Sequence, residues 1–393
     1  MNILIVTALF PPEPVVSAII SNDIAERLSD KHNVYIVAPK PSRPNGYKFS
    51  KLDFFKKKYN LNILESYVCS ESSLLGRLRE SYSFGKATKE FIELSKIKFD
   101  VIYINTWPLI AQYLTIKTSK KININSIIHI QDIYPESLIP KIPYLGNLIT
   151  KILLPIDKYI LQNANRIITI SNGMKNYLIK TRDLKTDKID VVYNWQDEKK
   201  LIGGLIENIR SNIFTFLYLG SLSPAAALEN IIISFIDASL ENCQLIIAGN
   251  GNEKNKLEKI ASKKGSNNII FIDAPSEKVG EIQSNCDALI LGLKKGASKL
   301  ALPSKLVSYM FSSKPIIAAV DFDSDIANVI IESHCGWVVE AENSFALVQT
   351  LNQVFNTNKN ELITKGEKAF EFATNNYSKE KCLSKIVDII ENE

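Results

Sequence analysis

The feature that most constrains the fold is an alternation of short apolar segments with longer segments of helical periodicity. In the first half, helical stretches such as 17–30, 83–97 and 145–163 separate the apolar segments. Strands that are apolar along their whole length are buried on both faces, which is typical of parallel sheets covered by helices. We therefore predict a parallel α/β sheet in this half, with strands at 2–9, 33–39, 101–105, 126–130, 166–171 and 189–194.

The alternation stops in a polar stretch, 194–212, and then starts again. A chain of 393 residues is too long for one ordinary core, so we predict two Rossmann-like, doubly wound parallel-sheet domains facing a cleft. The second set of strands is expected at 214–221, 243–251, 268–273, 288–293, 314–321 and 336–340. The expected boundaries are 1–196 for the first domain, 197–212 for a linker, 213–375 for the second domain and 376–393 for a closing helical segment.

Composition narrows the class of protein. Lys and Arg number 47 against 42 Asp and Glu, a net charge of +5, which argues against a nucleic-acid partner. The chain has no apolar run of about 18 residues and no secretory signal pattern, so a cytoplasmic protein is expected. The three histidines are far apart, which argues against a histidine-based metal site. Reduced, buried thiols are expected at Cys69, Cys243, Cys286, Cys335 and Cys382, because no two of them have metal-site spacing.

The segment "LPSKLVSYMFSSKPII" (302–317) is the first candidate site. Pro303, Ser304 and Lys305 stand where a short helix begins, and a helix N-terminus offers unpaired N–H groups and partial positive charge. The segment is therefore a candidate diphosphate cradle. The alternative is that Ser304 caps the helix and Lys305 is simply solvated.

Two glycine-bearing loops strengthen that interpretation. "YLGSLSP" (218–224) ends a predicted strand at Gly220, and "AGNGNE" (248–253) ends the next at Gly249 and Gly251. Glycine lets a ligand approach the backbone closely. Three such loops at strand carboxyl ends in one domain favour a nucleotide site there.

Taken in chain order, the segments 218–224, 248–253 and 302–317 resemble the donor-binding domain of the retaining glycosyltransferases of family 4, which have the GT-B fold. In the first half, "FPPEPVVSAIISNDIAERLSDKHNVYIVAP" is similar to the first strand, acceptor loop, first helix and second strand of that family. "IQDIYPESL" resembles a segment of bacterial members that build O-antigen or capsule. "FATNNYSKEKCLSKI" resembles the closing helix, which in that fold crosses back to the first domain.

The resemblance implies retaining transfer of a sugar from a nucleotide diphosphate, with UDP expected, to a lipid-diphosphate-linked saccharide. It also implies that no metal or other cofactor is needed. The leaving diphosphate would help to remove the acceptor proton, so the protein supplies positioning and electrostatic stabilisation. A cytoplasmic enzyme is expected, and either 54–60 or 139–160 could rest on an anionic membrane. The alternative for 54–60 is a solvated loop, and for 139–160 a helix packed on the sheet is the favoured interpretation.

The chain departs from the family where the donor diphosphate is usually held. The family arginine and lysine align with Ser221 and Ala226, and two family glutamates align with Leu300 and Ser308. A diphosphate still needs positive charge nearby, because burying an unpaired anion is costly. We expect Lys305 to supply it, followed by the lysines of "LGLKKGASK". The expected donor-binding residues are Gly220, Ser221, Gly249, Gly251, Lys294, Lys295, Pro303, Ser304, Lys305 and Ser308.

The first half supplies the candidate acceptor and catalytic residues. Glu13 and Ser17 are expected at the start of the first helix, facing the cleft, although Glu13 would also suit the helix dipole. Gln131 directly follows a predicted strand and is also expected on the acceptor side. Asp132 and Glu136 are the candidate catalytic carboxylates, able to bind sugar hydroxyls or accept a proton, unless they cap the next helix. His129 is expected in the core.

Other functions stay open on the sequence. The missing family charges would suit a non-catalytic protein that binds nucleotide sugars or assists assembly. A nucleotide-sugar 2-epimerase of the same fold is less favoured, because such enzymes bring several acidic and histidine residues together. A dehydrogenase is disfavoured because GxGxxG is absent. "DFDSD" (321–325) contains a DxD that binds metal in a different glycosyltransferase fold, but here a polar loop is the favoured interpretation.

Overall fold

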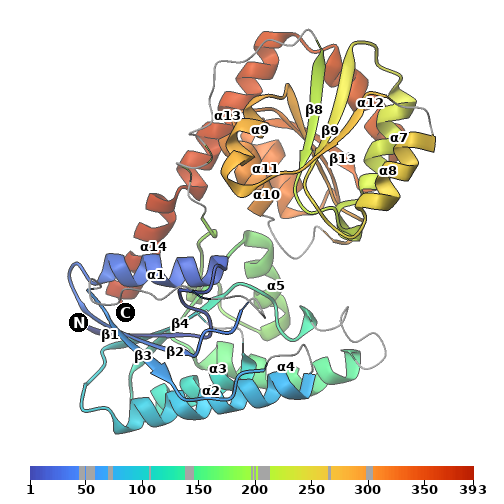
Figure 1. Cartoon of the computed structure of the whole chain (residues 1–393). Helices are drawn as coiled ribbons and strands as arrows, with labels where there is room; N and C mark the ends of the chain where they lie inside the picture. Colours follow the sequence, from blue (N-terminus) through green and yellow to red (C-terminus); the bar gives the residue numbers. More distant parts are fainter. Residues whose placement is uncertain are drawn as a thin grey trace. The chain divides into compact units, whose positions relative to one another are not determined.

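The chain folds into two compact units in a computed structural model (Figure 1). Unit 1 comprises Met1–Tyr193 together with Leu383–Glu393, and unit 2 comprises Asn194–Cys382. The structure describes residues 1–43, 49, 58–69, 74–105, 108–137, 146–195, 198, 201, 213–263, 267–297 and 304–393.

Unit 1 is built on a parallel sheet with the strand order β3-β2-β1-β4-β5-β6-β7. The central strands are apolar throughout and almost completely buried, as two-sided burial requires. The strands are β1 (Asn2–Thr7), β2 (Asn33–Pro39), β3 (Asn60–Leu64), β4 (Val101–Asn105), β5 (Asn125–Ile130), β6 (Arg166–Thr169) and β7 (Ile189–Val191).

Helices cover both faces of this sheet. Figure 1 shows α1 on one face and α2, α3 and α4 on the other, where Leu4, Ile102 and Ile128 belong to the unit's buried apolar cluster. The last residues of the chain join this unit, and the His32 ring nitrogen lies 2.8 Å from a Glu391 carboxylate oxygen. The helices are α1 (Val16–Leu28), α2 (Leu74–Leu94), α3 (Leu109–Lys121), α4 (Gly146–Asn163), α5 (Asn172–Arg182) and the end of α14 (Lys379–Glu391).

Unit 2 repeats the architecture with the strand order β10-β9-β8-β11-β12-β13. Its strands are β8 (Phe214–Leu219), β9 (Cys243–Ala248), β10 (Ile269–Ile272), β11 (Ala288–Gly292), β12 (Ile316–Val320) and β13 (Gly336–Glu340). Its helices are α7 (Leu228–Ala238), α8 (Lys254–Lys263), α9 (Val279–Ser284), α10 (Ser304–Phe311), α11 (Asp325–Ser333), α12 (Ser344–Phe355) and α13 (Lys359–Tyr377).

In each sheet, successive strands are added first on one side of the first strand and then on the other. This topological switch point lies between β1 and β4 in unit 1 and between β8 and β11 in unit 2. In open parallel sheets, ligands bind beyond the carboxyl ends of the strands at such a switch point. Ligand-binding residues are therefore expected after Thr7 and Asn105 in unit 1, and after Leu219 and Gly292 in unit 2.

The predicted fold of two doubly wound parallel sheets is confirmed. One strand was missed: β3 has polar Asn60 and Asn62 alternating with leucine and isoleucine, which is the pattern of an edge strand and not of a buried one. Residues 197–212, predicted as a linker, lie almost entirely outside the described residues.

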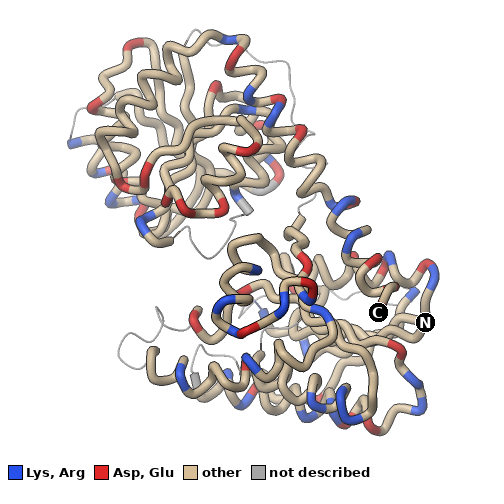
Figure 2. Tube along the Cα trace, turned by 180° about the vertical axis from the view of Figure 1, so that it is seen from behind, with Lys and Arg blue, Asp and Glu red and all other residues tan. Residues whose placement is uncertain are grey.

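All five cysteines are buried, and none forms a disulfide. Basic and acidic residues are interspersed over both units (Figure 2). Among the helices that the structure describes, none is both long and apolar enough to cross a membrane.

Candidate functional site

Lys305 lies at the switch point of unit 2. It follows the first residue of α10, and its side chain crosses the end of β8. Its ammonium nitrogen donates to the Tyr218 hydroxyl at 2.6 Å and lies 4.2 Å from the centroid of the same ring. Within the described part of the chain, no carboxylate pairs with this ammonium group. Burial lowers the pKa of Lys305 to about 8.

The Tyr218 hydroxyl is held from its other side as well. It donates to the backbone carbonyl of Ser221 at 2.7 Å, so the lysine, the tyrosine and the loop after β8 form one hydrogen-bonded chain. The Ser221 side chain itself is exposed. The result is a half-buried cation fixed beside an exposed loop, which suits an incoming anion better than a solvated lysine would.

The glycines of the two loops have a packing reason. Gly220 has a φ of +148°, and a β-carbon there would come within 2.5 Å of Lys305 Cε. Gly249 has a φ of +139°, and its β-carbon would overlap the Gly220 carbonyl. Gly251 likewise abuts the carbonyl of Leu222. These glycines let the two loops and the lysine lie against one another, and the contact between glycine and ligand stays a prediction.

The other predicted cations lie in the turn after β11. Lys294 and Lys295 are exposed, and the turn is held by two carboxylates. Asp321 accepts the Gly296 N–H with both oxygens, at 3.0 and 2.9 Å, and Glu342 accepts the Lys295 N–H at 3.1 Å. Asp321 therefore orders this turn, which is the loop role favoured for "DFDSD". Across the described residues, no three His, Cys, Asp or Glu side chains are grouped as a metal site.

The remaining residues predicted to bind the donor are Ser308, Ser304 and Pro303, and they lie in different surroundings. Ser308 is 7% exposed, and its hydroxyl is bonded to the amide of Gln283 at 3.0 Å, so it faces the interior of the unit. Ser304 is the first residue of α10. Pro303, like Lys299 and Leu300, lies outside the described residues.

In unit 1 the switch point carries a chain of polar side chains. Ser17 Oγ donates to Gln131 Oε1, Gln131 Nε2 to Asn105 Oδ1, and Asn105 Nδ2 to Ser21 Oγ, each at 2.8 Å. Ser21 in turn donates to the Ser17 carbonyl at 2.9 Å. Ser17 and Gln131, each predicted separately on the acceptor side, are thus brought together, while Asn105 and Ser21 were missed. Asn105 ends β4 at the switch point, which is the signal that could have found it.

Glu13 organises the loop before α1. Its carboxylate accepts the backbone N–H groups of Phe10 at 3.1 Å, Ser42 at 2.8 Å and Arg43 at 2.9 Å, and the residue is 4% exposed. It therefore ties the loop after β1 to the loop after β2. With its oxygens occupied in this way, Glu13 is a poorer candidate for acceptor contact than Ser17 or Gln131.

The two candidate catalytic carboxylates lie in different surroundings. Asp132 is exposed, directly after Gln131. Glu136 is bound by both terminal nitrogens of Arg182 at 2.7 Å each. Burial alone would raise the pKa of Glu136, but the hydrogen bonds and charge of Arg182 outweigh it and leave that pKa below its usual value. A carboxylate held this way is a weak base, which counts against Glu136 as a proton acceptor.

His129 is in the core, as expected. It is 2% exposed, its Nδ1 lies 2.7 Å from the Tyr103 hydroxyl, and burial lowers its pKa to about 4. A neutral histidine beneath the polar chain can support the sheet, but it offers no charge to a ligand.

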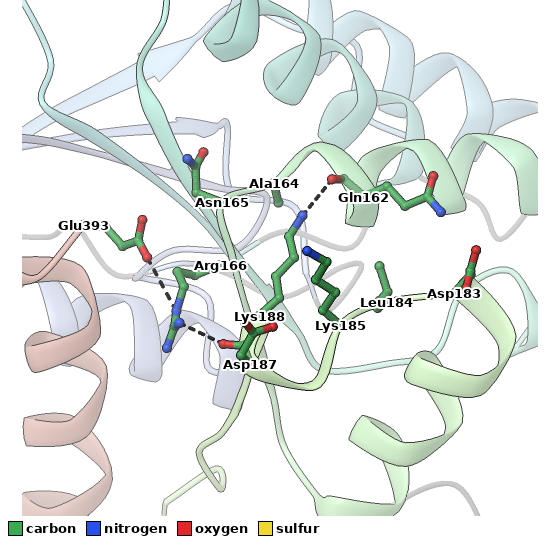
Figure 3. A pocket seen from close by; sticks show the side chains of 10 residues that line it. All are labelled: Gln162, Ala164, Asn165, Arg166, Asp183, Leu184, Lys185, Asp187, Lys188 and Glu393. Carbon is green, nitrogen blue, oxygen red and sulfur yellow. Dashed lines mark hydrogen bonds and ion pairs between the residues drawn. The ribbon is translucent and has the colours of Figure 1, made fainter.

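A hollow of about 680 Å³ lies elsewhere in unit 1 (Figure 3). Arg166 at the start of β6, Lys188 just before β7, and Glu393 line it, so it opens at the amino ends of the strands. Arg166 pairs with Asp190 at 2.6 Å, and Lys188 donates to the Gln162 carbonyl at 2.6 Å. Arg166 and Lys188 are thus engaged within the unit, and the hollow stands at the amino-end edge of the sheet, opposite the switch point.

Comparison with protein families covers both units. A model described as "Glycosyl transferases group 1" matches residues 206–370, and one described as "Glycosyltransferase Family 4" matches residues 20–200. The chain belongs to the group 1 and family 4 glycosyltransferases. The resemblance noted in the sequence is thereby confirmed, and the fold of this glycosyltransferase is GT-B.

Named relatives agree with this family. The glycosyltransferase is 22% identical over 262 residues to the probable glycosyltransferase WbjE of Pseudomonas aeruginosa, covering 64% of this chain and 63% of that protein. It is 23% identical over 257 residues to the putative colanic acid biosynthesis glycosyl transferase WcaI of Escherichia coli, covering 62% and 61%. Each match thus spans less than two thirds of the relative. The structure of Anabaena HepE in complex with UDP matches with a TM-score of 0.71 at 16% identity, over 100% of both chains.

Proposed function

We propose that this protein transfers a sugar, with retention of configuration, from a UDP-sugar bound by unit 2 to a lipid-linked saccharide in bacterial surface polysaccharide synthesis. The observation that carries the proposal is the Lys305 cation, held by Tyr218 across Gly220 at the switch point. WbjE, WcaI and the UDP complex of HepE support the choice of reaction and nucleotide.

In the proposed reaction, the bond between the anomeric carbon and the diphosphate oxygen breaks, and UDP leaves with the bonding electrons. An acceptor hydroxyl forms the new glycosidic bond on the same face, and its proton passes to a diphosphate oxygen. Lys305 stabilises the negative charge that develops on the diphosphate, which is the kind of interaction that strengthens in the transition state. Exposed Asp132 and the amide of Gln131 are proposed to bind sugar hydroxyls.

Peripheral contact with an anionic membrane is the proposed way in which the acceptor is reached. Segment 54–60 lies mainly outside the described residues, but α4 within 139–160 is described from Gly146 onward. Its exposed face carries Leu148 and Ile152, which are 56% and 63% exposed, with exposed Lys151 between them. An apolar stripe with a basic residue suits the boundary of an anionic bilayer.

A thermal-shift panel tests the nucleotide part of the proposal. The protein is heated with UDP, GDP, ADP, CMP or NAD, each with and without EDTA. A ligand that binds only the folded state raises the free energy of unfolding, by about 2.7 kcal/mol at a hundredfold excess over its Kd. A rise with UDP that EDTA does not remove supports a metal-independent donor site, whereas a rise with NAD alone contradicts it.

A non-catalytic nucleotide-sugar-binding protein is the second candidate, since Ser221 and Ala226 stand where the resemblance implies basic residues. The two functions differ in turnover. Release of UDP from UDP-sugar in the presence of membrane lipid extract supports the transferase, while UDP binding without any release supports the binding protein.

A further inference from the structure

The turn after β5 carries the exposed carboxylate of Asp132, and it is fixed on its amino-terminal side. Gln131 accepts from Ser17 and donates to Asn105, both at 2.8 Å, so its amide cannot rotate without breaking two hydrogen bonds. On the other side of Asp132, Ile133 is 5% exposed and belongs to the apolar core. Beyond it the described backbone leaves the sheet in a turn, in which the Ser137 N–H donates to the Ile133 carbonyl at 3.0 Å.

Arg182, the last residue of α5, also holds this turn. It is 0% exposed, which is rare for arginine. Its two terminal nitrogens bind the two oxygens of Glu136 at 2.7 Å each, and one of them also reaches the Tyr134 carbonyl at 3.3 Å. Three of its hydrogen bonds therefore go to residues two to four positions after Asp132.

The arginine is itself anchored in α4. Its Nε donates to Asp157 Oδ2 at 2.6 Å, and Asp157 is 4% exposed. Tyr177 adds a hydrogen bond to Glu136 at 3.1 Å. A planar, two-pronged guanidinium fixes direction as well as distance, which a lysine ammonium does not do. The turn is thus connected to two helices through one buried side chain.

We propose that Arg182 is a positioning residue, which holds the turn from Gln131 to Glu136 so that Asp132 is presented at the carboxyl end of β5 for sugar recognition. This inference rests on the proposed function. In this proposal Arg182 acts through Asp132 and Gln131, and it contacts neither the sugar donor nor the acceptor.

A double-mutant cycle tests the proposal, with UDP-glucose as the probe and release of UDP as the signal. We expect Arg182→Lys to lower kcat at least tenfold and to leave KM for UDP-glucose within about twofold. Asp132→Asn should lower kcat as well, and the double variant should be no slower than Asp132→Asn alone. Residues that act as one unit are non-additive in this way, whereas a general loss of stability multiplies with any other defect.

Two variants serve as controls. Arg166→Lys replaces a guanidinium that lies 2.6 Å from Asp190 in the same unit, but at the amino end of a strand, and it should leave kcat unchanged. Glu136→Gln keeps packing and one acceptor oxygen, so its kcat should fall between wild type and Arg182→Lys. Losses that multiply in the double variant, or an equal loss in Arg166→Lys, overturn the proposal.

Hydrogen exchange separates this inference from the proposed function. The amides of 130–137 should exchange at least tenfold faster in folded Arg182→Lys than in wild type, with those of β8 unchanged. Unchanged exchange in 130–137 overturns the anchoring role whether or not UDP-glucose is turned over. Absence of UDP binding by the wild type counts against the proposed function alone.

Discussion

The ammonium group of Lys305 makes two contacts with the same aromatic residue, 2.6 Å from the Tyr218 hydroxyl oxygen and 4.2 Å from the ring centroid. The residues are 87 positions apart, and the glycine after β8 leaves room for the lysine to pass. A single tyrosine thus orients this cation from both its hydroxyl group and its ring face.

Removing the Tyr218 hydroxyl should weaken nucleotide binding modestly. Tyr218→Phe keeps the ring face but loses the hydrogen bonds to Lys305 and to the Ser221 carbonyl. A hydrogen bond contributes about 0.5–1.5 kcal/mol net, so the Kd for UDP should rise ~2- to 10-fold by calorimetry. Tyr159→Phe in unit 1 is the control. A larger loss in the control than in Tyr218→Phe would contradict this role.

Gly220→Ala should damage the site, and Gly296→Ala supplies a matched comparison. Both glycines have positive φ, +148° and +81°, so alanine is strained at either position. Only at Gly220 does the new methyl group meet Lys305, because nothing lies within 4 Å at Gly296. Gly220→Ala should raise the Kd for UDP at least tenfold, and Gly296→Ala less than threefold. Similar Kd values for the two would refute the close packing of Lys305 on Gly220.

The affinity for UDP should depend on pH through Lys305. Burial lowers the pKa of this lysine to about 8 in the free protein, and only the charged form attracts a diphosphate. Affinity should therefore be flat from pH 7 to about 7.5 and fall as pH rises beyond 8. In Lys305→Ala this decline should vanish. A wild-type decline that persists in the variant would assign it to another group.

The same lysine links pH to stability. Its pKa is lower in the folded protein than in the unfolded chain, so the unfolded state binds more protons between about pH 8 and the usual lysine value. This group therefore opposes folding below pH 8, and its unfavourable contribution disappears as pH rises through that window. Urea titrations of wild type and Lys305→Met at pH 7 and pH 9.5 should show the variant gaining stability relative to wild type at the lower pH. An equal difference at both pH values would contradict the lowered pKa.

Membrane contact should depend on the exposed face of α4. The double variant Leu148→Ser and Ile152→Ser removes two side chains, each contributing about 1.5–3 kcal/mol if fully buried in lipid. Binding to vesicles that contain phosphatidylglycerol should drop at least tenfold in a sedimentation assay. Phe345→Ser with Ile331→Ser, at 73% and 57% exposure in unit 2, is the control pair. Equal binding by wild type and the α4 variant would remove α4 from the proposal.

The sequence was informative where burial alone decides structure. Central strands such as β1 and β4 are apolar throughout, and their positions follow from that pattern. β3 was missed because an edge strand buries less and alternates polar with apolar residues. Lys305 was predicted as a donor-site residue because it stands at a helix N-terminus, which is a local signal.

The hydrogen-bond and ion-pair partners of the side chains could not be predicted from the sequence, because they join residues far apart in the chain. Nothing local links Arg182 to Glu136, 46 positions away, or Ser17 to Gln131, 114 positions away. Glu136 was chosen as a catalytic carboxylate for its place after a strand, and the partner that lowers its pKa was invisible. The turn ordered by Asp321 and the burial of Ser308 against Gln283 are further cases.

The most direct test of the account is a calorimetric titration of UDP into wild type, Lys305→Ala and Lys294→Ala at pH 7.5. A charge-assisted hydrogen bond contributes about 1.5–3 kcal/mol, so Lys305→Ala should raise the Kd ~10- to 150-fold. The exposed Lys294 is the matched lysine of the same unit, and its variant should change the Kd less than threefold. Unchanged affinity in folded Lys305→Ala would contradict the account. A large loss of affinity in Lys294→Ala instead would show that the diphosphate binds at the turn after β11.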